Sequence, residues 1–188
     1  MNIDDLFEAI DTPRTRLRCP DVNDATDIAK LVTPEVSRWL AAWPAPITEA
    51  MVVARILRAR LEITEGSALH FLVERLEDRA LMGWIRISRN ETQPGIGDLG
   101  YWLNEAYHRC GYASEAAAQA LAIGFERLEL ENIESGAQLE NTASFAVMRK
   151  LGMEPCGERL IWAETRHREE VCLFYSVHRD RYNISLSS

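Results

Sequence analysis

The sequence predicts a mixed α/β fold in which a mostly antiparallel sheet is flanked by helices. Three observations support this prediction. Apolar residues recur at helical spacing in some segments and form short strand-like runs in others. The 188 residues are 47% apolar, which is enough to bury one sizeable core. No repeat, low-complexity tract or linker divides the chain, so we expect one domain over residues 1–188, with its core at about 13–178 and loose ends at 1–12 and 182–188.

The first third of the chain carries the signals of one strand and two helices. An extended segment at Thr15–Arg18 ends before Pro20. Asp21 and Thr48 are residues of the type that cap helix N-termini, and Gly66 is of the type that ends a helix. We therefore expect a strand at residues 15–18 and helices at about 21–32 and 48–66, separated by an aromatic-rich segment.

The rest of the chain begins with three apolar strands and then alternates helices with strands. The three strands, at residues 68–74, 80–88 and 96–103, are joined by short connections, which favours antiparallel pairing. Beyond them we expect a helix at 112–128, a strand at 133–139, a helix at 142–151 and a strand hairpin at 154–163 and 168–177.

One motif is misleading in its context. Gly95–Gly100 matches the dinucleotide-binding pattern GxGxxG letter for letter. That pattern requires a strand before it and a helix opening within it, so that the diphosphate meets helix N–H groups. Here a polar loop precedes the glycines and the strand-like Tyr101–Leu103 follows them. We interpret the motif as a turn leading into a strand.

Charge and composition exclude several classes of protein. With 21 Lys and Arg against 29 Asp and Glu, the formal net charge is −8, which argues against nucleic-acid and membrane-surface binding. No apolar run approaches the length of a membrane span, and the N-terminus lacks the features of a signal peptide. The four cysteines and four histidines show no metal-ligand spacing. We expect a cytoplasmic protein with reduced thiols and no bound metal.

The informative segment runs from Asp98 to Ala116. A strand ends near Leu103, and a helix begins at about Gly111–Ala113. Small residues at the start of a helix leave its N–H groups uncovered, and such groups bind anions. An ordinary strand–helix turn uses glycine equally well, so this pattern alone does not decide between a binding site and a turn.

Two blocks together resemble a known family. His108–Ala113 resembles the Gln/Arg-x-x-Gly-x-Gly/Ala loop with which the GNAT superfamily of N-acetyltransferases binds acyl-CoA, and Asn141–Met153 resembles a later helix of that family. With Asp98–Leu103, the spacing is similar to that of the RimJ/RimL branch, which acetylates N-terminal amines of ribosomal proteins. The loop departs from the pattern at His108, Arg109 and Cys110, where the family favours Gln or Arg, Gly, and Lys or Arg.

The resemblance implies a fold, an activity and a cofactor. The fold would be GNAT-like, with a central, mostly antiparallel sheet of six to seven strands flanked by about four helices. The activity would be transfer of an acetyl group from acetyl-CoA to a primary amine, either a protein N-terminus or a small amine. A homodimer is a further expectation. The residues implied in acetyl-CoA binding are Trp102, Leu103, His108, Arg109, Cys110, Gly111, Tyr112, Ala113, Ser114, Asn141 and Ser144.

The chemistry of acetyl transfer indicates two catalytic candidates. An alkylammonium must lose a proton before it attacks a thioester, and Asp98 stands where relatives place a carboxylate near the amine; Asp98 as a solvated strand-edge residue is the equal alternative. Many relatives carry a tyrosine acid seven residues after the capping Asn, but Met148 occupies that position. The Asn-x-x-Ser pattern instead favours Ser144 as the acid, although Ser144 could simply bond to backbone. A main-chain N–H near Leu103 is the expected oxyanion donor.

The acceptor site is less well defined by the sequence. Trp39, Trp43 and Trp84 are candidates for its wall because aromatic faces suit an ammonium, although such residues pack in cores more often; Glu35 is a further candidate. Two alternatives to the acetyltransferase hypothesis remain at this point. One is a noncatalytic CoA-binding or regulatory module, favoured by Met148 and the altered loop, and the other is a transferase that uses a longer acyl-CoA.

Overall fold

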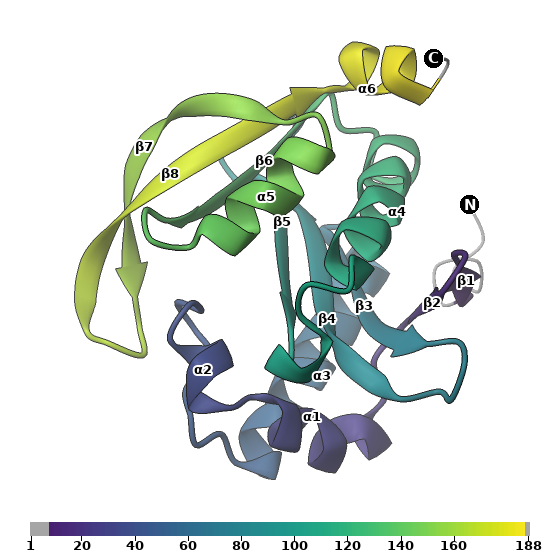
Figure 1. Cartoon of the computed structure of the whole chain (residues 1–188), viewed down its shortest axis with the longest axis vertical. Helices are drawn as coiled ribbons and strands as arrows, with labels where there is room; N and C mark the ends of the chain where they lie inside the picture. Colours follow the sequence, from purple (N-terminus) through teal and green to yellow (C-terminus); the bar gives the residue numbers. More distant parts are fainter. Residues whose placement is uncertain (1–7, 187–188) are drawn as a thin grey trace.

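The computed structural model describes residues 8–186, with side chains described through residue 182. Figure 1 shows a twisted sheet with helices on both faces and a long C-terminal hairpin. In the described residues the strands are β1 (Ile10–Asp11), β2 (Thr15–Arg18), β3 (Ala68–Arg75), β4 (Leu81–Arg89), β5 (Ile96–Leu103), β6 (Asn132–Gln138), β7 (Glu154–Ala163) and β8 (Arg168–His178). The helices are η2 (Val22–Asp24), α1 (Ala25–Leu31), α2 (Pro34–Ser37), α3 (Glu49–Glu65), η3 (Glu105–Tyr107), α4 (Tyr112–Arg127), α5 (Thr142–Lys150) and α6 (Arg179–Leu186).

The sheet has the order β1-β2-β3-β4-β5-β6-β8-β7, and its strands pair antiparallel except at one place. The exception is β5 with β6, which pair in parallel over Ile96–Asp98 and Asn132–Glu134. Parallel neighbours need a crossover connection, and α4 supplies it. The mixed α/β class and the mostly antiparallel sheet are confirmed.

Two apolar cores lie on the two faces of the sheet. Alternate residues of a strand face opposite sides, so β5 sends Leu99, Tyr101 and Leu103 to one core and Trp102 to the other. The first core contains the inner sides of α4 and α5, and the second contains those of α1, α2 and α3. Gly124 allows α4 to pack closely, because a Cβ there would lie 2.1 Å from Cδ1 of Ile87. The sheet is therefore a rigid support for whatever lies at the end of β5.

The local signals are largely confirmed. The side chain of Thr48 accepts from the N–H of Met51 at 3.3 Å and caps α3, and Gly66 ends that helix with φ +69°. Asp21 begins a 3-10 turn that continues into α1, where one helix was expected. The GxGxxG glycines form the turn into β5 and the strand itself, as expected.

The expected numbers of strands and helices are wrong. The sheet has one strand more than the six to seven expected, because Ile10–Asp11 pairs with β2. The described residues hold six α-helices where four were expected, because α2 and α6 carry no strong periodic signal. Both ends that were predicted to be loose carry regular structure where they are described, at β1 and α6; the remaining positions, 1–7 and 187–188, lie outside the described residues.

A buried histidine connects α3 with the sheet. Nε1 of Trp84 donates to Nδ1 of His70 at 3.1 Å, and Nε2 of His70 lies 2.7 Å from Oε2 of Glu62. Because Nδ1 accepts a hydrogen bond, the proton must lie on Nε2, which donates to Glu62. Burial lowers the pKa of His70 to about 4, so the ring is neutral at physiological pH.

This arrangement predicts a loss of stability in acid. In the unfolded chain His70 titrates near its ordinary value, so the unfolded state binds the proton first as the pH falls from about 6.5 toward 4. The contribution of neutral His70 is complete above that window and is lost through it, by roughly 2–3 kcal/mol. We expect His70→Gln to reduce the difference in unfolding free energy between pH 7 and pH 4.5, measured by urea denaturation. His178→Gln, at an exposed histidine, is the control and should keep the difference.

Candidate active site

The separation of β5 from β6 creates the candidate site. Their pairing ends at Asp98 and Glu134, and beyond these residues the two strands diverge, as Figure 1 shows. A cavity of about 660 Å³ lies in the opening, lined by residues 98–103 of β5 and 134–138 of β6. Because the strands do not pair with each other there, main-chain groups that face the gap are not used in bonds between β5 and β6. The site therefore offers backbone hydrogen bonds that an intact sheet would consume.

The end of β5 presents a main-chain donor to this opening. The N–H of Asn104 donates to the carbonyl of Met82 at 2.8 Å, so Asn104 faces β4. Successive residues of a strand face opposite edges, so Leu103 faces away from β4, and its carbonyl bonds to Nε2 of His108 at 2.9 Å. The N–H of Leu103 lies on the same side as that carbonyl. The predicted oxyanion donor thus points toward the opening between the strands.

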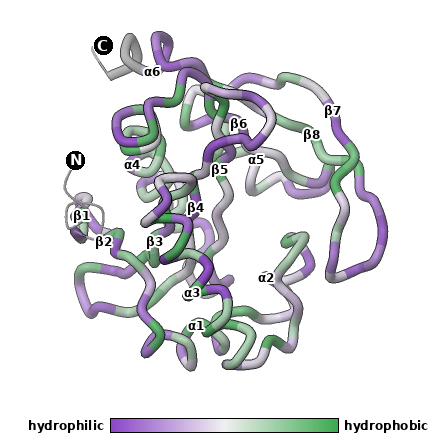
Figure 2. Tube along the Cα trace, turned by 180° about the vertical axis from the view of Figure 1, so that it is seen from behind, coloured by the Kyte–Doolittle hydropathy of each residue, from purple (hydrophilic) through white to green (hydrophobic). Residues whose placement is uncertain are grey.

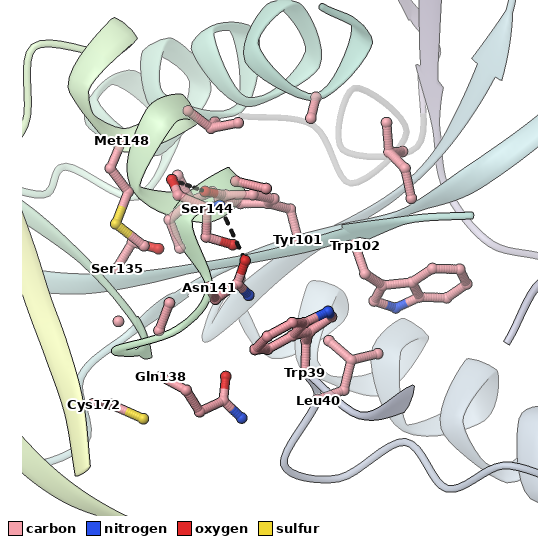
Figure 3. Close-up of a pocket in the computed structure, with 18 of the residues that line it drawn as sticks. Trp39, Leu40, Tyr101, Trp102, Ser135, Gln138, Asn141, Ser144, Met148 and Cys172 are labelled. Atoms are coloured by element: carbon pink, nitrogen blue, oxygen red, sulfur yellow. Dashed lines mark hydrogen bonds between the residues drawn. The ribbon is translucent and has the colours of Figure 1, made fainter. Parts of the chain in front are cut away.

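The start of α5 forms one side of the cavity. The side chain of Asn141 caps the helix by accepting from the N–H of Ser144 at 3.2 Å, and the hydroxyl of Tyr101 donates to the carbonyl of Ser144 at 3.1 Å (Figure 3). Burial raises the pKa of Tyr101, which therefore stays protonated. These bonds fix the backbone of Ser144 and do not involve its Oγ. Met148 lies one turn further along the same wall.

The loop before α4 contains two left-handed residues directly before the N-terminus of a helix. Arg109 and Gly111 both have positive φ, +60° and +83°, and no side chain among residues 8–182 caps the N-terminus of α4. Alternation of such conformations directs successive N–H groups to one side. Among the residues predicted to bind the cofactor, those that line the cavity are Trp102, Leu103, His108, Arg109, Gly111, Ala113, Ser114, Asn141 and Ser144. Cys110, which is exposed, and Tyr112 do not line it.

The predicted acceptor residues are only partly brought together. Trp39 lines the cavity together with its neighbour Leu40 (Figure 3). Trp43 and Trp84 lie behind the wall, where Trp43 makes edge contacts with Trp84 at 5.4 Å and with Trp102 at 5.2 Å between ring centroids. Their position corrects the expectation that they face the acceptor, because they support Trp102 from the core. Glu35 is exposed on α2 beside Arg38 and does not line the cavity.

Two carboxylates meet where the strands separate. Asp98 and Glu134 are opposite each other in the parallel pair, and both line the cavity. Burial, with the negative charge of Glu134, raises the pKa of Asp98. Glu134 is buried and bonds to Nη2 of Arg159 at 3.0 Å, whereas Asp98 has a long contact of 3.5 Å with Asn90. Sequence reasoning missed Glu134; a carboxylate in the interior of an expected strand was the available signal.

The hairpin of β7 and β8 closes the far side of the cavity. At its turn the N–H of Thr165 donates to the carbonyl of Ala41 at 3.1 Å, and Arg166 donates to the carbonyl of Leu40 at 3.1 Å. Arg166 also pairs with Glu170 at 2.8 Å and holds the pKa of that carboxyl at about 2. Figure 2 shows that this end of the hairpin is hydrophilic. The turn is therefore held against the segment after α2 by polar bonds.

Comparison with known proteins identifies the family. Residues 14–154 match the acetyltransferase (GNAT) domain, and the chain belongs to this family. A relative from Bacillus licheniformis, described as the uncharacterized N-acetyltransferase p20, is 26% identical over 153 residues, which are 80% of this chain and 85% of the relative. The protein is accordingly an acyltransferase that uses acetyl-CoA.

Solved structures share the fold at lower identity. Mycobacterium smegmatis RimJ in complex with CoA-disulfide is 19% identical with a TM-score of 0.78, and the match covers 92% of this chain and 89% of RimJ. The ribosomal-protein-S5-alanine acetyltransferase from Vibrio fischeri is 20% identical with a TM-score of 0.78, covering 93% and 98%. The chain is thus similar in fold to RimJ/RimL-type enzymes. Within the described residues, no helix is long and apolar enough to cross a membrane.

The loop conformation predicts the effect of filling Gly111. An alanine would be strained at φ +83°, and its Cβ would lie 3.2 Å from Nη2 of Arg14. We expect Gly111→Ala to raise the KM for acetyl-CoA roughly fivefold with a smaller change in kcat, in steady-state kinetics. Gly66→Ala is the matched control, because Gly66 also has positive φ but lies at the end of α3. An unchanged KM in Gly111→Ala would contradict the assignment.

Proposed function

We propose that the protein transfers the acetyl group of acetyl-CoA to a primary amine by direct attack in a ternary complex. One observation carries this proposal: the separation of β5 from β6 gathers Asp98, the N–H of Leu103 and Ser144 around one cavity. These three groups supply what the reaction requires, namely a proton acceptor for the amine, a donor for the oxyanion and a donor near the leaving thiolate.

Asp98 is the proposed proton acceptor. An alkylammonium has a pKa of about 10, so it must lose a proton before attack. Partial burial and the nearby Glu134 raise the pKa of Asp98, which makes its carboxylate a better base than an exposed one. Asp98 takes the proton directly or through a water. Glu134 is the weaker candidate for this role because its carboxylate is engaged by Arg159.

Two negative charges develop during the reaction. The N–H of Leu103 stabilises the oxyanion, and Ser144 protonates the leaving thiolate. As the amine attacks, negative charge develops on the carbonyl oxygen of the thioester, and the N–H of Leu103 stabilises it; such donors contribute roughly 3–4 kcal/mol. The tetrahedral intermediate then expels the CoA thiolate. Ser144 donates the proton that neutralises the thiolate and regains a proton from the attacking nitrogen, which must lose one to become an amide; the backbone of Ser144 is held by Asn141 and Tyr101. The N–H groups of the loop at residues 108–113 bind the diphosphate of acetyl-CoA.

The proposed acceptor is the amine of a protein N-terminus or a small amine. Trp39 and Trp102 line the cavity and offer aromatic faces to an ammonium. RimL, a structure similar to this chain at 17% identity and a TM-score of 0.80, is a ribosomal L7/L12 alpha-N-protein acetyltransferase. That activity supports an α-amine as the acceptor of this chain.

A panel of acceptors tests the proposed function. We expect acetyl-CoA to release free thiol only when an amine is added, with the acetylated product identified by mass spectrometry. The panel should contain peptides with free and blocked N-termini, polyamines and simple alkylamines. CoA binding without turnover on any amine would instead support a noncatalytic CoA-binding module. Turnover with a longer acyl-CoA but not with acetyl-CoA would support the other alternative.

Substitution of the two catalytic candidates tests their roles. We expect Asp98→Asn to lower kcat/KM by about 100-fold or more and to remove the acidic limb of the pH profile. The raised pKa of Asp98 places this limb above the ordinary carboxyl range, with activity rising as the pH passes through it. We expect Ser144→Ala to lower kcat by about tenfold or more. Asp78→Asn, on the β3–β4 turn, is the control, and near-normal rates in both active-site variants would remove the assigned roles.

A further inference from the structure

Thr12 and Arg14, near the N-terminus, both donate hydrogen bonds to the carboxylate of Glu115 at the start of α4. Glu115, in the first turn of α4, accepts three hydrogen bonds from the segment between β1 and β2. Oγ1 of Thr12 donates to its Oε1 at 2.6 Å, the N–H of Arg14 donates to the same oxygen at 2.7 Å, and Nε of Arg14 donates to Oε2 at 2.8 Å. Only 15% of the Glu115 side chain is exposed, so the contact is enclosed despite its position near the surface.

Arg14 also holds the loop that precedes α4. Its Nη1 donates to the carbonyl of Cys110 at 3.0 Å, and its guanidinium lies over the ring of Tyr112, 4.8 Å from the centroid. Between these two residues, a Cβ on Gly111 would lie 3.2 Å from Nη2 of Arg14. Arg14 therefore contacts the residues on both sides of Gly111, through the carbonyl of Cys110 and the ring of Tyr112, and leaves little room for a side chain at Gly111 itself. None of these contacts uses a loop N–H group, so those donors remain available to a ligand.

We propose that Arg14 and Glu115 are positioning residues of the acetyl-CoA site. Arg14 holds residues 110–112 in the conformation that presents their N–H groups and neutralises the carboxylate of Glu115 beside the diphosphate. The proposal rests on the proposed assignment of this loop to the diphosphate. Neither residue needs to touch acetyl-CoA for the effect to occur.

The charge of Glu115 explains why the pair is needed. Partial burial disfavours its ionised form, but the hydrogen bonds from Thr12 and Arg14 outweigh this effect and lower the pKa of Glu115. The carboxylate is thus ionised at neutral pH. A negative charge in the first turn favours the helix, yet it repels an anion bound at the same N-terminus. Pairing with Arg14 cancels the repulsion and keeps the benefit to the helix.

Substitution of Arg14 should therefore weaken acetyl-CoA binding more than substitution of Glu115. Arg14→Gln leaves the Glu115 carboxylate uncompensated and also releases the loop, so we expect the Kd for acetyl-CoA to rise roughly fivefold to tenfold. Glu115→Gln removes the repulsive charge together with its bonds, so we expect a change of about twofold or less. The double variant should recover part of the affinity lost in Arg14→Gln. Arg14→Lys keeps the charge but loses the fork of donors, and should lie between wild type and Arg14→Gln.

The experiment compares two donors, acetyl-CoA and acetyl-pantetheine, which lacks the diphosphate. Kd for acetyl-CoA comes from calorimetry, and kcat/KM for both donors comes from thiol release with an amine acceptor. We expect Arg14→Gln to weaken use of acetyl-CoA while leaving kcat/KM for acetyl-pantetheine within about twofold of wild type. Arg16→Gln is the matched control, because Arg16 lies on the neighbouring strand and pairs with Asp11 rather than with the loop. It should match wild type with both donors.

Each unfavourable outcome has a separate meaning. If wild type uses both donors equally well, the loop does not bind the diphosphate, and that part of the proposed function fails with the inference. If wild type prefers acetyl-CoA and Arg14→Gln keeps the preference, only the inference is overturned. Equal losses with both donors in Arg14→Gln also overturn it, since they indicate a general effect on folding. Should Arg14→Gln not fold, Arg14→Lys decides, and unchanged affinity in that variant overturns the inference.

Discussion

The site depends on the point at which two parallel strands stop pairing. Sheet strands normally satisfy each other's N–H and carbonyl groups, so an interrupted pair leaves donors and acceptors that a side chain, water or ligand can satisfy. Here the interruption follows Asp98 and Glu134 directly, which places two carboxylates at its apex and the N–H of Leu103 along one arm. The helices α4 and α5 begin beside the same opening, so their N-termini face it. The end of this pairing thus positions both the groups proposed for catalysis and the helix N-termini proposed to bind acetyl-CoA.

Local signals predicted most of the elements because their causes are local. The Thr48 cap and the left-handed Gly66 bounded α3 correctly, and apolar runs located β3 to β8 within a residue or two. The short elements were missed because they owe their structure to partners. Strand β1 has two residues and exists only through its bonds to β2, and α2 is a single turn after Thr33. Elements that depend on contacts between residues distant in the sequence produce no hydrophobic periodicity from which they could be predicted.

The functional residues divide in the same way. Ser144, Asn141 and the 108–113 loop follow a local spacing in the sequence, and the structure places Ser144, Asn141 and all of the loop except Cys110 and Tyr112 on one cavity. The sequence could not distinguish Trp43 and Trp84 from Trp39, because residue type alone does not show which tryptophan faces the cavity. Only the packing shows that Trp39 lines the cavity while Trp43 and Trp84 contact each other in the core behind it. Glu134 and its partner Arg159 are 25 residues apart, and only the sheet order brings them together.

The closure of the hairpin over the cavity has a consequence for how this scaffold can diversify. Thr165 and Arg166 bind the carbonyl oxygens of Ala41 and Leu40, and every amino acid carries that oxygen. The side chains at these two positions line the cavity but are not needed to hold the hairpin. They can therefore be exchanged without opening the enclosure, so selection can alter the shape offered to an incoming molecule while the architecture around it is inherited intact.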